Sequence, residues 1–191
     1  MGRPATKKNI MEEAAIELFA TRGLARTVIK DIALKAGVTE GALYKHYPGK
    51  NEMAWSLFCR EVERFSSKFE KIIFSDDQTN KTRLGESIRY IYQYYYDHPI
   101  HFSFILLTQH GFPEEKLLDE KKNPTDMVIR FIKTVIWKDS PVIKDATLLA
   151  GMIMGLVMQP IIMHRYGRLP NNPLKSVDAV IEACKRLLEV Y

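Results

Sequence analysis

Two short helical segments separated by one glycine constrain this chain more than any other feature of its sequence. Residues 32–44 read Ile-Ala-Leu-Lys-Ala-Gly-Val-Thr-Glu-Gly-Ala-Leu-Tyr. Gly37 can adopt the left-handed conformation that ends a helix, and Thr39 can cap the helix that follows. Helices joined over so short a turn cross at a steep angle. The segment therefore predicts a helix-turn-helix, although a purely structural αα-corner would show the same pattern.

Helical periodicity extends over the whole chain, and the alternation typical of strands is absent. The periodic segments are interrupted where glycine, proline or short polar runs occur, at Gly23, Pro48-Gly49, residues 76–80, Asn123-Pro124 and residues 167–173. The sequence therefore predicts an all-α fold of about nine helices. A three-helix domain is expected over residues 1–50, and a larger helical domain over residues 51–191.

The positive charge of the chain is concentrated in the first of these domains. Residues 1–50 carry nine Lys or Arg against five Asp or Glu, whereas residues 51–191 carry nineteen against eighteen. Most of the formal net charge of +5 thus lies in the first quarter of the sequence. This distribution suits a domain that contacts a polyanion, although a solvated basic face would look the same.

Catalytic and metal-binding patterns are not evident. The sequence contains no nucleophile elbow, phosphate-binding loop or His-Glu-x-x-His motif, so neither an enzyme nor a cofactor is predicted. His98, His101 and His110 do not share one helical face, and no metal site is expected from them. Cys59 and Cys184 lie far apart without metal-ligand spacing, which fits a reducing cytoplasm.

One segment has the composition of a membrane span. Residues 146–163 contain no charged side chain over a length just sufficient to cross a bilayer. A helix buried between other helices is apolar all round for the same reason. Because Gln159-Pro160 interrupts the segment and no aromatic belt flanks it, we predict a buried helix in a cytoplasmic protein.

The segment from Ile10 to Ala54 resembles the DNA-binding domain of the TetR family of bacterial regulators. The matching positions are Ala14-Ala15, Leu18-Phe19, Gly23, Thr27, Ile32-Ala33, Ala36-Gly37-Val38-Thr39, Gly41, Leu43-Tyr44, His46-Tyr47 and Lys50. The resemblance implies double-stranded operator DNA as a partner, a homodimer, and a small-molecule site in the second domain. Two positions depart from the family pattern: Val28 replaces a frequent hydroxyl residue, and Tyr47 stands where Phe is usual.

The helix that begins at Thr39 is the expected reader of bases. Gly41 and Ala42, near its start, are small enough to let the backbone approach the major-groove floor and touch a thymine methyl group. Lys45, one turn later, can reach a guanine edge or a phosphate.

Phosphate contacts are expected around this helix. Tyr44 and His46 carry donors suited to phosphate oxygens, and Lys50 adds charge at the start of the next helix. Thr27 can donate from its hydroxyl or its backbone at the start of the preceding helix. The basic N-terminal arm, composed of Arg3, Lys7 and Lys8, could reach a neighbouring groove or belong to a disordered end.

The last two helices are the predicted dimer interface. Gly151 and Gly155 are four residues apart and permit close helix approach. The final helix carries one apolar stripe, composed of Val177, Val180, Ile181, Cys184, Leu187, Leu188 and Tyr191. Two such helices from each chain would form a four-helix interface. Alternatively, both helices cover only their own core.

Aromatic and thioether side chains in the second domain suit an adaptable apolar site, or an ordinary core. The candidate ligand-binding residues are Tyr92, Tyr95, Phe102, Phe131, Met154 and Met158. We therefore expect a small hydrophobic or aromatic effector that releases a repressor from its operator. The alternative is a TetR-like coactivator that acts through protein contacts without binding DNA.

Overall fold

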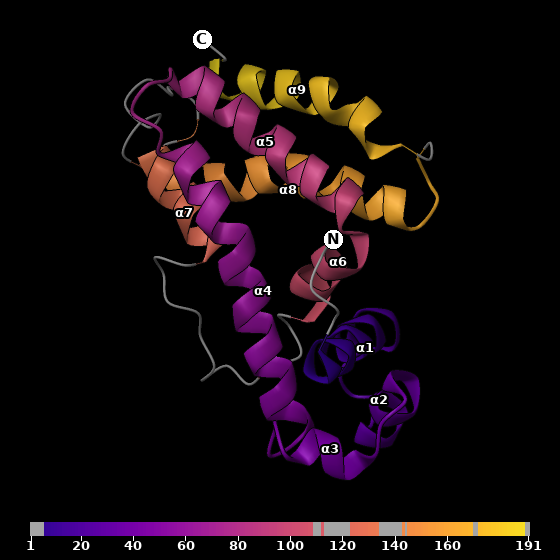
Figure 1. Ribbon diagram of the computed structural model, residues 1–191. Helices are drawn as coiled ribbons and strands as arrows, with labels where there is room; N and C mark the ends of the chain where they lie inside the picture. The colour runs from indigo at the N-terminus through magenta and orange to yellow at the C-terminus, as the bar shows by residue number, and fades with distance from the viewer. Residues whose placement is uncertain are drawn as a thin grey trace, which may run out of the picture. The chain divides into compact units, whose positions relative to one another are not determined.

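The computed structural model describes residues 6–108, 112, 123–133, 143, 145–169 and 172–189. In these ranges the ordered elements are all helical, which confirms the predicted fold class. The elements are α1 (Lys7–Arg22), α2 (Ile29–Ala36), α3 (Glu40–Tyr44), α4 (Lys50–Ile73), α5 (Asn80–Asp97), α6 (Pro99–Thr108), α7 (Pro124–Phe131), α8 (Ala146–Arg165), the 3₁₀ helix η4 (Pro173–Ser176) and α9 (Val177–Glu189), shown in Figure 1. Arg3, His110 and Tyr191 lie outside the described residues.

The chain divides into two compact units. The first comprises Met1–Glu63 and His98–Leu117, and the second comprises Arg64–Asp97 and Leu118–Tyr191. Helix α4 is continuous across residues 63 and 64, so its first part belongs to one unit and its last part to the other. The functional boundary expected near residue 50 stays a prediction.

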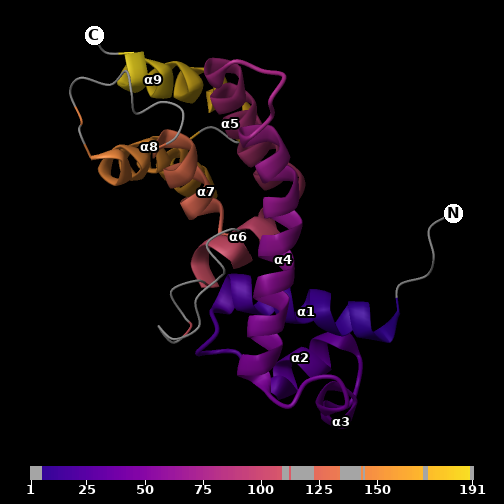
Figure 2. The ribbon, with the colours of Figure 1, turned by 90° about the vertical axis from the view of Figure 1, so that its left-hand side faces the viewer.

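In the first unit, α1 packs against both α2 and α6. Its core contains the rings of Phe19, Phe58 and Phe104, and the Phe104 centroid lies 6.1 Å from that of Phe19 and 6.3 Å from that of Phe58. Figure 2 shows α1 and α2 beside the N-terminal part of α4. These aromatic contacts join three segments that are distant in the sequence, α1, α4 and α6.

The turn between α2 and α3 has the predicted chemistry. Gly37 adopts a left-handed conformation with φ 66° and ψ 35°. The backbone N–H of Val38 donates to the Ala33 carbonyl over 3.0 Å, a hydrogen bond that closes the end of α2. Thr39 then caps α3, because its hydroxyl oxygen accepts from the backbone N–H of Ala42 over 3.3 Å.

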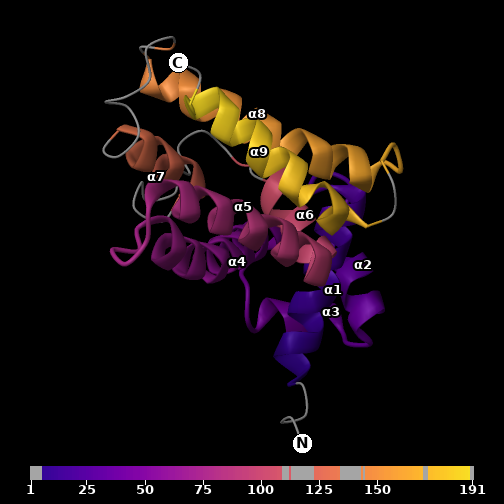
Figure 3. The same ribbon diagram turned by 90° about the horizontal axis from the view of Figure 1, so that it is seen from above.

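In the second unit, α5 packs against α8, α9 and η4. The Tyr92 hydroxyl on α5 donates to the Val157 carbonyl on α8 over 3.1 Å. A Cβ added to Gly85 would lie 3.7 Å from Cγ2 of Ile181, which shows how closely α5 approaches α9. Figure 3 shows α8 and α9 running side by side.

Helix α8 differs from the expected all-round buried helix, because the described residues of the chain cover only one of its faces. The buried face is formed by Ala146, Leu149, Ala150, Ile153, Val157 and Ile161. The opposite face is exposed and largely apolar, and we call it the α8 stripe: Leu148, Gly151, Met152, Gly155, Leu156 and Gln159. By length and composition alone α8 could cross a membrane, but core helices of soluble proteins pass the same test.

By contrast, the apolar stripe predicted on the last helix is largely buried. Val177, Val180, Ile181 and Cys184 are all buried within the chain's own core, and burial raises the pKa of the Cys184 thiol to about 11. Among the described residues of this stripe, only Leu187 and Leu188 are half-buried. Most of the stripe is therefore already used inside the chain and is not free for a partner.

Two glycines of the helix-turn-helix should respond to alanine in opposite ways. Gly37→Ala should lower the free energy of unfolding by about 1–2 kcal/mol, because an L-residue is strained at φ 66°. Gly41→Ala should preserve or raise it by up to about 1 kcal/mol, since Gly41 is helical and the nearest atom to an added Cβ is 3.9 Å away. Urea unfolding of both variants checks this pair, and equal effects would contradict the turn geometry.

Candidate nucleic-acid interface

The recognition helix α3 has one buried anchor and an exposed outer surface. Leu43 is 1% exposed and attaches the helix to the core of the first unit. Gly41, Lys45 and His46 are exposed, and Tyr44 is 53% exposed. Within the part of the chain that the structure describes, these side chains form no hydrogen bond or ion pair, so they are available to an external partner.

Ala42 and Thr39 complete this surface in different ways. Ala42 is half-buried, so its methyl group is only partly accessible. The Thr39 hydroxyl already accepts the capping hydrogen bond from Ala42, and its O–H proton remains to be donated. The open space around Gly41 leaves the backbone of the first turn accessible.

Lys50 is the first residue of α4. The free backbone N–H groups at this N-terminus carry positive potential. A cation at this position is disfavoured by the helix dipole, and its Nζ is held by the Leu24 carbonyl at 2.9 Å. The combination of a fixed ammonium group and a helix N-terminus is suited to an anion such as a phosphate.

Thr27 departs from the prediction made for its hydroxyl. The side chain is fully buried, and Oγ1 donates to the Gly23 carbonyl over 2.9 Å. The hydroxyl therefore closes the loop between α1 and α2 and is not directed outward. A contact from Thr27 to DNA would have to come from its backbone.

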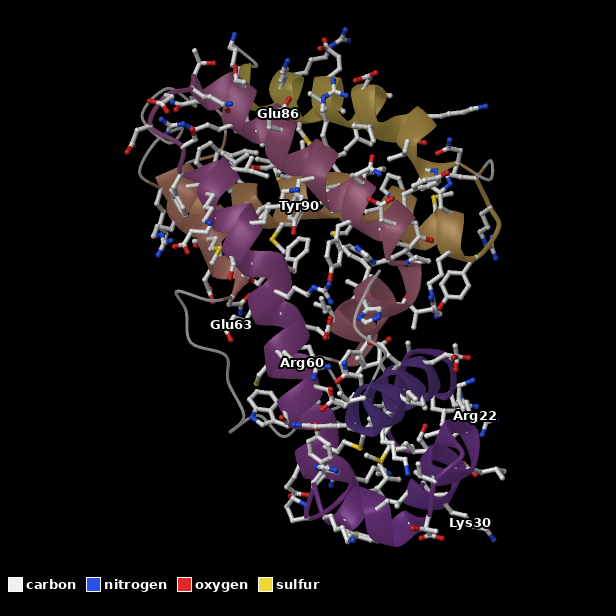
Figure 4. The ribbon with its side chains drawn as sticks, viewed as in Figure 1. Arg22, Lys30, Arg60, Glu63, Glu86 and Tyr90 are labelled. Atoms are coloured by element: carbon white, nitrogen blue, oxygen red, sulfur yellow. The ribbon has the colours of Figure 1, made fainter. Side chains whose placement is uncertain are left out.

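The structure adds one cation that the sequence analysis did not single out. Lys30 lies exposed in the first turn of α2, and among the described residues no ion pair involves it (Figure 4). By contrast, Lys35 pairs with Glu17 at 2.8 Å and Arg22 pairs with Asp31 at 3.4 Å. Lys30 follows Thr27-Val28-Ile29 directly in the sequence, and this position could have indicated Lys30 as a candidate for DNA contact.

Behind α3, a hydrogen-bonded network explains why Tyr47 differs from the family's usual Phe. The buried Tyr47 hydroxyl donates to Glu12 on α1, and Arg60 on α4 pairs with the other oxygen of that carboxylate. Burial raises the pKa of Glu12, but the hydrogen bonds from Tyr47 and Arg60 outweigh it and hold the pKa below its usual value. Burial and the bond to Glu12 raise the pKa of Tyr47. The extra hydroxyl thus has a structural partner.

The predicted effector residues do not form one group. Phe102 belongs to the first unit, where it is buried, whereas the other five belong to the second unit. Tyr92 and Phe131 are almost fully buried, and Tyr95, Met154 and Met158 are half-buried. Burial raises the pKa of Tyr92, whose hydroxyl already has a partner in α8.

Helices α2 and α3, joined by the turn at Gly37 and carrying an exposed outer surface, form a helix-turn-helix in the first unit. Residues 13–56 match the family described as "Bacterial regulatory proteins, tetR family". A transcriptional repressor, KstR2 of Mycolicibacterium smegmatis, is 30% identical over 71 residues, which are 37% of this chain and 35% of that relative. The match to the TetR family thus covers residues 13–56, and the sequence likeness to the curated relative spans about a third of that relative's length.

Solved structures match nearly the whole chain. The ketosteroid transcriptional regulator KstR2 of Mycobacterium tuberculosis matches with a TM-score of 0.75 and 19% identity, covering 98% of this chain and 95% of that one. The regulator FadR of Bacillus subtilis, in complex with stearoyl-CoA, matches with a TM-score of 0.68 and 20% identity, covering 95% and 98%. At these identities the likeness establishes the shared fold.

Two neighbouring tyrosines should separate DNA contact from structural support. Tyr44→Phe should leave the free energy of unfolding unchanged, because its exposed hydroxyl has no partner within the described ranges, and should weaken binding to every DNA sequence by about 1 kcal/mol. Tyr47→Phe should lower the free energy of unfolding by about 2 kcal/mol, because Glu12 loses a charge-assisted hydrogen bond. Unfolding and DNA titrations of both variants provide the comparison, and destabilisation by Tyr44→Phe would contradict it.

Proposed function

We propose that the protein is a transcriptional regulator that binds double-stranded operator DNA as a homodimer and acts as a repressor. The observation that carries this proposal is the surface of α3, where Gly41, Tyr44, Lys45 and His46 are exposed together. The small residue lets the backbone approach base edges, and the three long side chains supply donors. No catalytic role is proposed for the chain.

We propose that bases are read by Gly41, Ala42 and Lys45, and that phosphates are held by other groups around the same surface. These groups are Thr39, Tyr44, His46, Lys50, the backbone of Thr27 and, added from the structure, Lys30. Lysines that neutralise phosphates release counterions, so binding should weaken steeply as salt rises.

We propose that two copies associate through the last two helices, with the α8 stripe at the centre. Leu148, Met152 and Leu156 are 57%, 46% and 38% exposed, although all three are large and apolar. An added Cβ at Gly151 or Gly155 would meet no atom within 4 Å, so these glycines are not required for packing inside the chain. Their lack of a side chain would instead allow a second helix to come close. A second copy of this face is self-complementary under twofold symmetry.

We propose a hydrophobic effector with a small polar group, bound in the second unit. Ser66 on α4 and Ser87 on α5 are both 3% exposed, and neither Oγ has a hydrogen-bond partner among the residues that the structure describes. Leaving such a group unsatisfied costs about 1–3 kcal/mol, which a bound acceptor would recover. Tyr95, Phe131, Met154 and Met158 would supply apolar surface. One protein with a similar solved structure is named a ketosteroid regulator, and another was solved with stearoyl-CoA, whose acyl chain is apolar.

The alternative is a coactivator that uses the first unit for protein contacts. Its one specific support is Leu34 on α2, which is 81% exposed and offers an apolar contact. The unpaired cations on the same unit favour DNA over a protein partner.

Selection of DNA sequences from a random pool by the purified protein tests the main proposal. We expect one enriched sequence with twofold symmetry, because two recognition helices would engage two half-sites. Lys45→Ala should change the enriched sequence at specific positions, since Lys45 is the long exposed side chain near the end of α3. Lys71→Ala, on the exposed surface of α4, is the matched control and should return the wild-type sequence. No enrichment and no salt-dependent binding would support the coactivator.

The interface is tested by changing the α8 stripe. Met152→Glu combined with Leu156→Glu should convert a dimer to monomers, because four buried carboxylates would cost several kcal/mol. Gly155→Leu should have the same effect while preserving the fold, since the added side chain meets open space within the chain. Gln78→Glu, in an exposed loop of the same unit, is the control for added charge. Sedimentation velocity would show dimers in all three variants if the stripe is not the interface.

A further inference from the structure

His101 on α6 is held between two carboxylates that come from two other helices. Its Nδ1 lies 2.9 Å from Oε2 of Glu61 on α4, and its Nε2 lies 3.0 Å from Oε2 of Glu13 on α1. A neutral imidazole has only one N–H, so it can donate to one of these carboxylates only. The protonated ring can donate to both. The geometry therefore fits the imidazolium form.

From Glu61 the contacts continue to Tyr47, which lies three residues after the end of α3. Oε1 of Glu61 accepts from Nε of Arg60 at 3.2 Å, and the same guanidinium group pairs with Glu12. Glu12 in turn accepts from the Tyr47 hydroxyl. The backbone N–H of Tyr47 donates to the Leu43 carbonyl at 3.0 Å, at the end of α3. Arg60 is labelled on α4 in Figure 4.

The charges of this network balance only when His101 is protonated. Three carboxylates take part, of which Glu12 and Glu61 are 5% and 2% exposed in their side chains and Glu13 is 60% exposed. The cations are His101, Arg60 and Lys8, whose Nζ lies 3.7 Å from Glu12. The ring of His98, which precedes α6, lies 6.2 Å from that of His101, between centroids.

Among the described residues, deprotonation of His101 would leave the buried Glu61 with Arg60 as its only cation. Glu61 and Glu12 would then compete for one guanidinium group, and a buried carboxylate without a cation is costly. Movement of Arg60 toward Glu61 would remove the partner that orients Glu12 toward Tyr47. A change at α6 would thus reach the end of the recognition helix.

We propose that His101 is a positioning residue for operator binding, and that its proton strengthens the affinity for DNA. The protonated ring holds Glu61, so that Arg60 stays on Glu12 and Tyr47 fixes the end of α3. This inference rests on the proposed function and adds to it a dependence on pH. It concerns residues that do not themselves touch DNA.

The direction of the pH effect follows from the contacts. Hydrogen bonding to Glu61 raises the pKa of His101, burial opposes this, and the charges of Glu13 and Glu61 add to the increase. Below the ordinary histidine pKa of about 6.5 the contribution of the proton to stability is fully present. It is lost as the pH rises through the raised pKa of the folded protein. Operator affinity should therefore fall on going from mildly acidic to mildly alkaline solution.

The test measures operator affinity of the full chain at about pH 6 and about pH 9, at constant ionic strength, with the selected DNA as the probe. All variants carry His46→Asn, so that the exposed surface proposed to contact DNA has no histidine and the comparison concerns His101. In this background we expect affinity to fall about tenfold between the two pH values. His101→Arg should keep the higher affinity at both, and His101→Gln should show the lower affinity at both.

Glu13→Gln distinguishes the proposed role of His101 from a purely structural one. If the role were purely structural, this substitution would leave the midpoint of the pH profile unchanged. Glu13 is exposed, so the substitution should leave folding intact, as circular dichroism at both pH values would check for every variant. Removal of one carboxylate should shift the midpoint of the pH profile to lower pH while the affinity at low pH is retained.

Two results would overturn the inference, and they differ from failure of the proposed function. The same pH dependence in the parent, His101→Arg and His101→Gln proteins would exclude His101. So would a Glu13→Gln midpoint equal to that of the parent. A wild-type protein that binds no DNA at either pH would instead refute the proposed function, and the inference with it.

Discussion

The recognition helix depends on contacts made by residues at and after its end, because five residues are too few to form a stable helix alone. Leu43 inserts into the core, and Tyr47 donates to a carboxylate on α1 that is itself held from α4. The apolar contact of Leu43 fixes how closely α3 packs on the core, whereas the hydrogen bonds of Tyr47 fix the orientation of the helix. The rest of the first unit, including the aromatic contacts to α6, supplies the rigid surroundings that make both effective.

Local rules were sufficient to predict the helix-turn-helix. The left-handed turn at Gly37 and the cap at Thr39 depend on residues within four positions of each other, and short-range chemistry decides them. Exposure of Tyr44, Lys45 and His46 follows from the same helical register, once Leu43 is recognised as the inward residue. The TetR resemblance was visible for this reason, within one quarter of the chain.

Long-range contacts were not predictable in this way. Nothing near His101 in the sequence shows that Glu13 and Glu61 flank it, because these carboxylates lie 88 and 40 positions away along the chain. The sequence predicted an apolar stripe on α9 and an uncharged, buried α8, but it did not show that the chain covers most of the α9 stripe itself and leaves one face of α8 exposed. That distinction depends on how α5 packs, and on the close approach at Gly85.

The uncovered face of α8 has a consequence for how abundance and stability are related. If a second copy covers it, part of the protein's hydrophobic burial exists only when two chains meet. The melting temperature would then rise with protein concentration, and newly made chains at low concentration would display a sticky apolar surface. Such chains would be the ones presented to chaperones and proteases. The amount of the regulator in the cell would then depend on the degradation of unpaired chains as well as on synthesis.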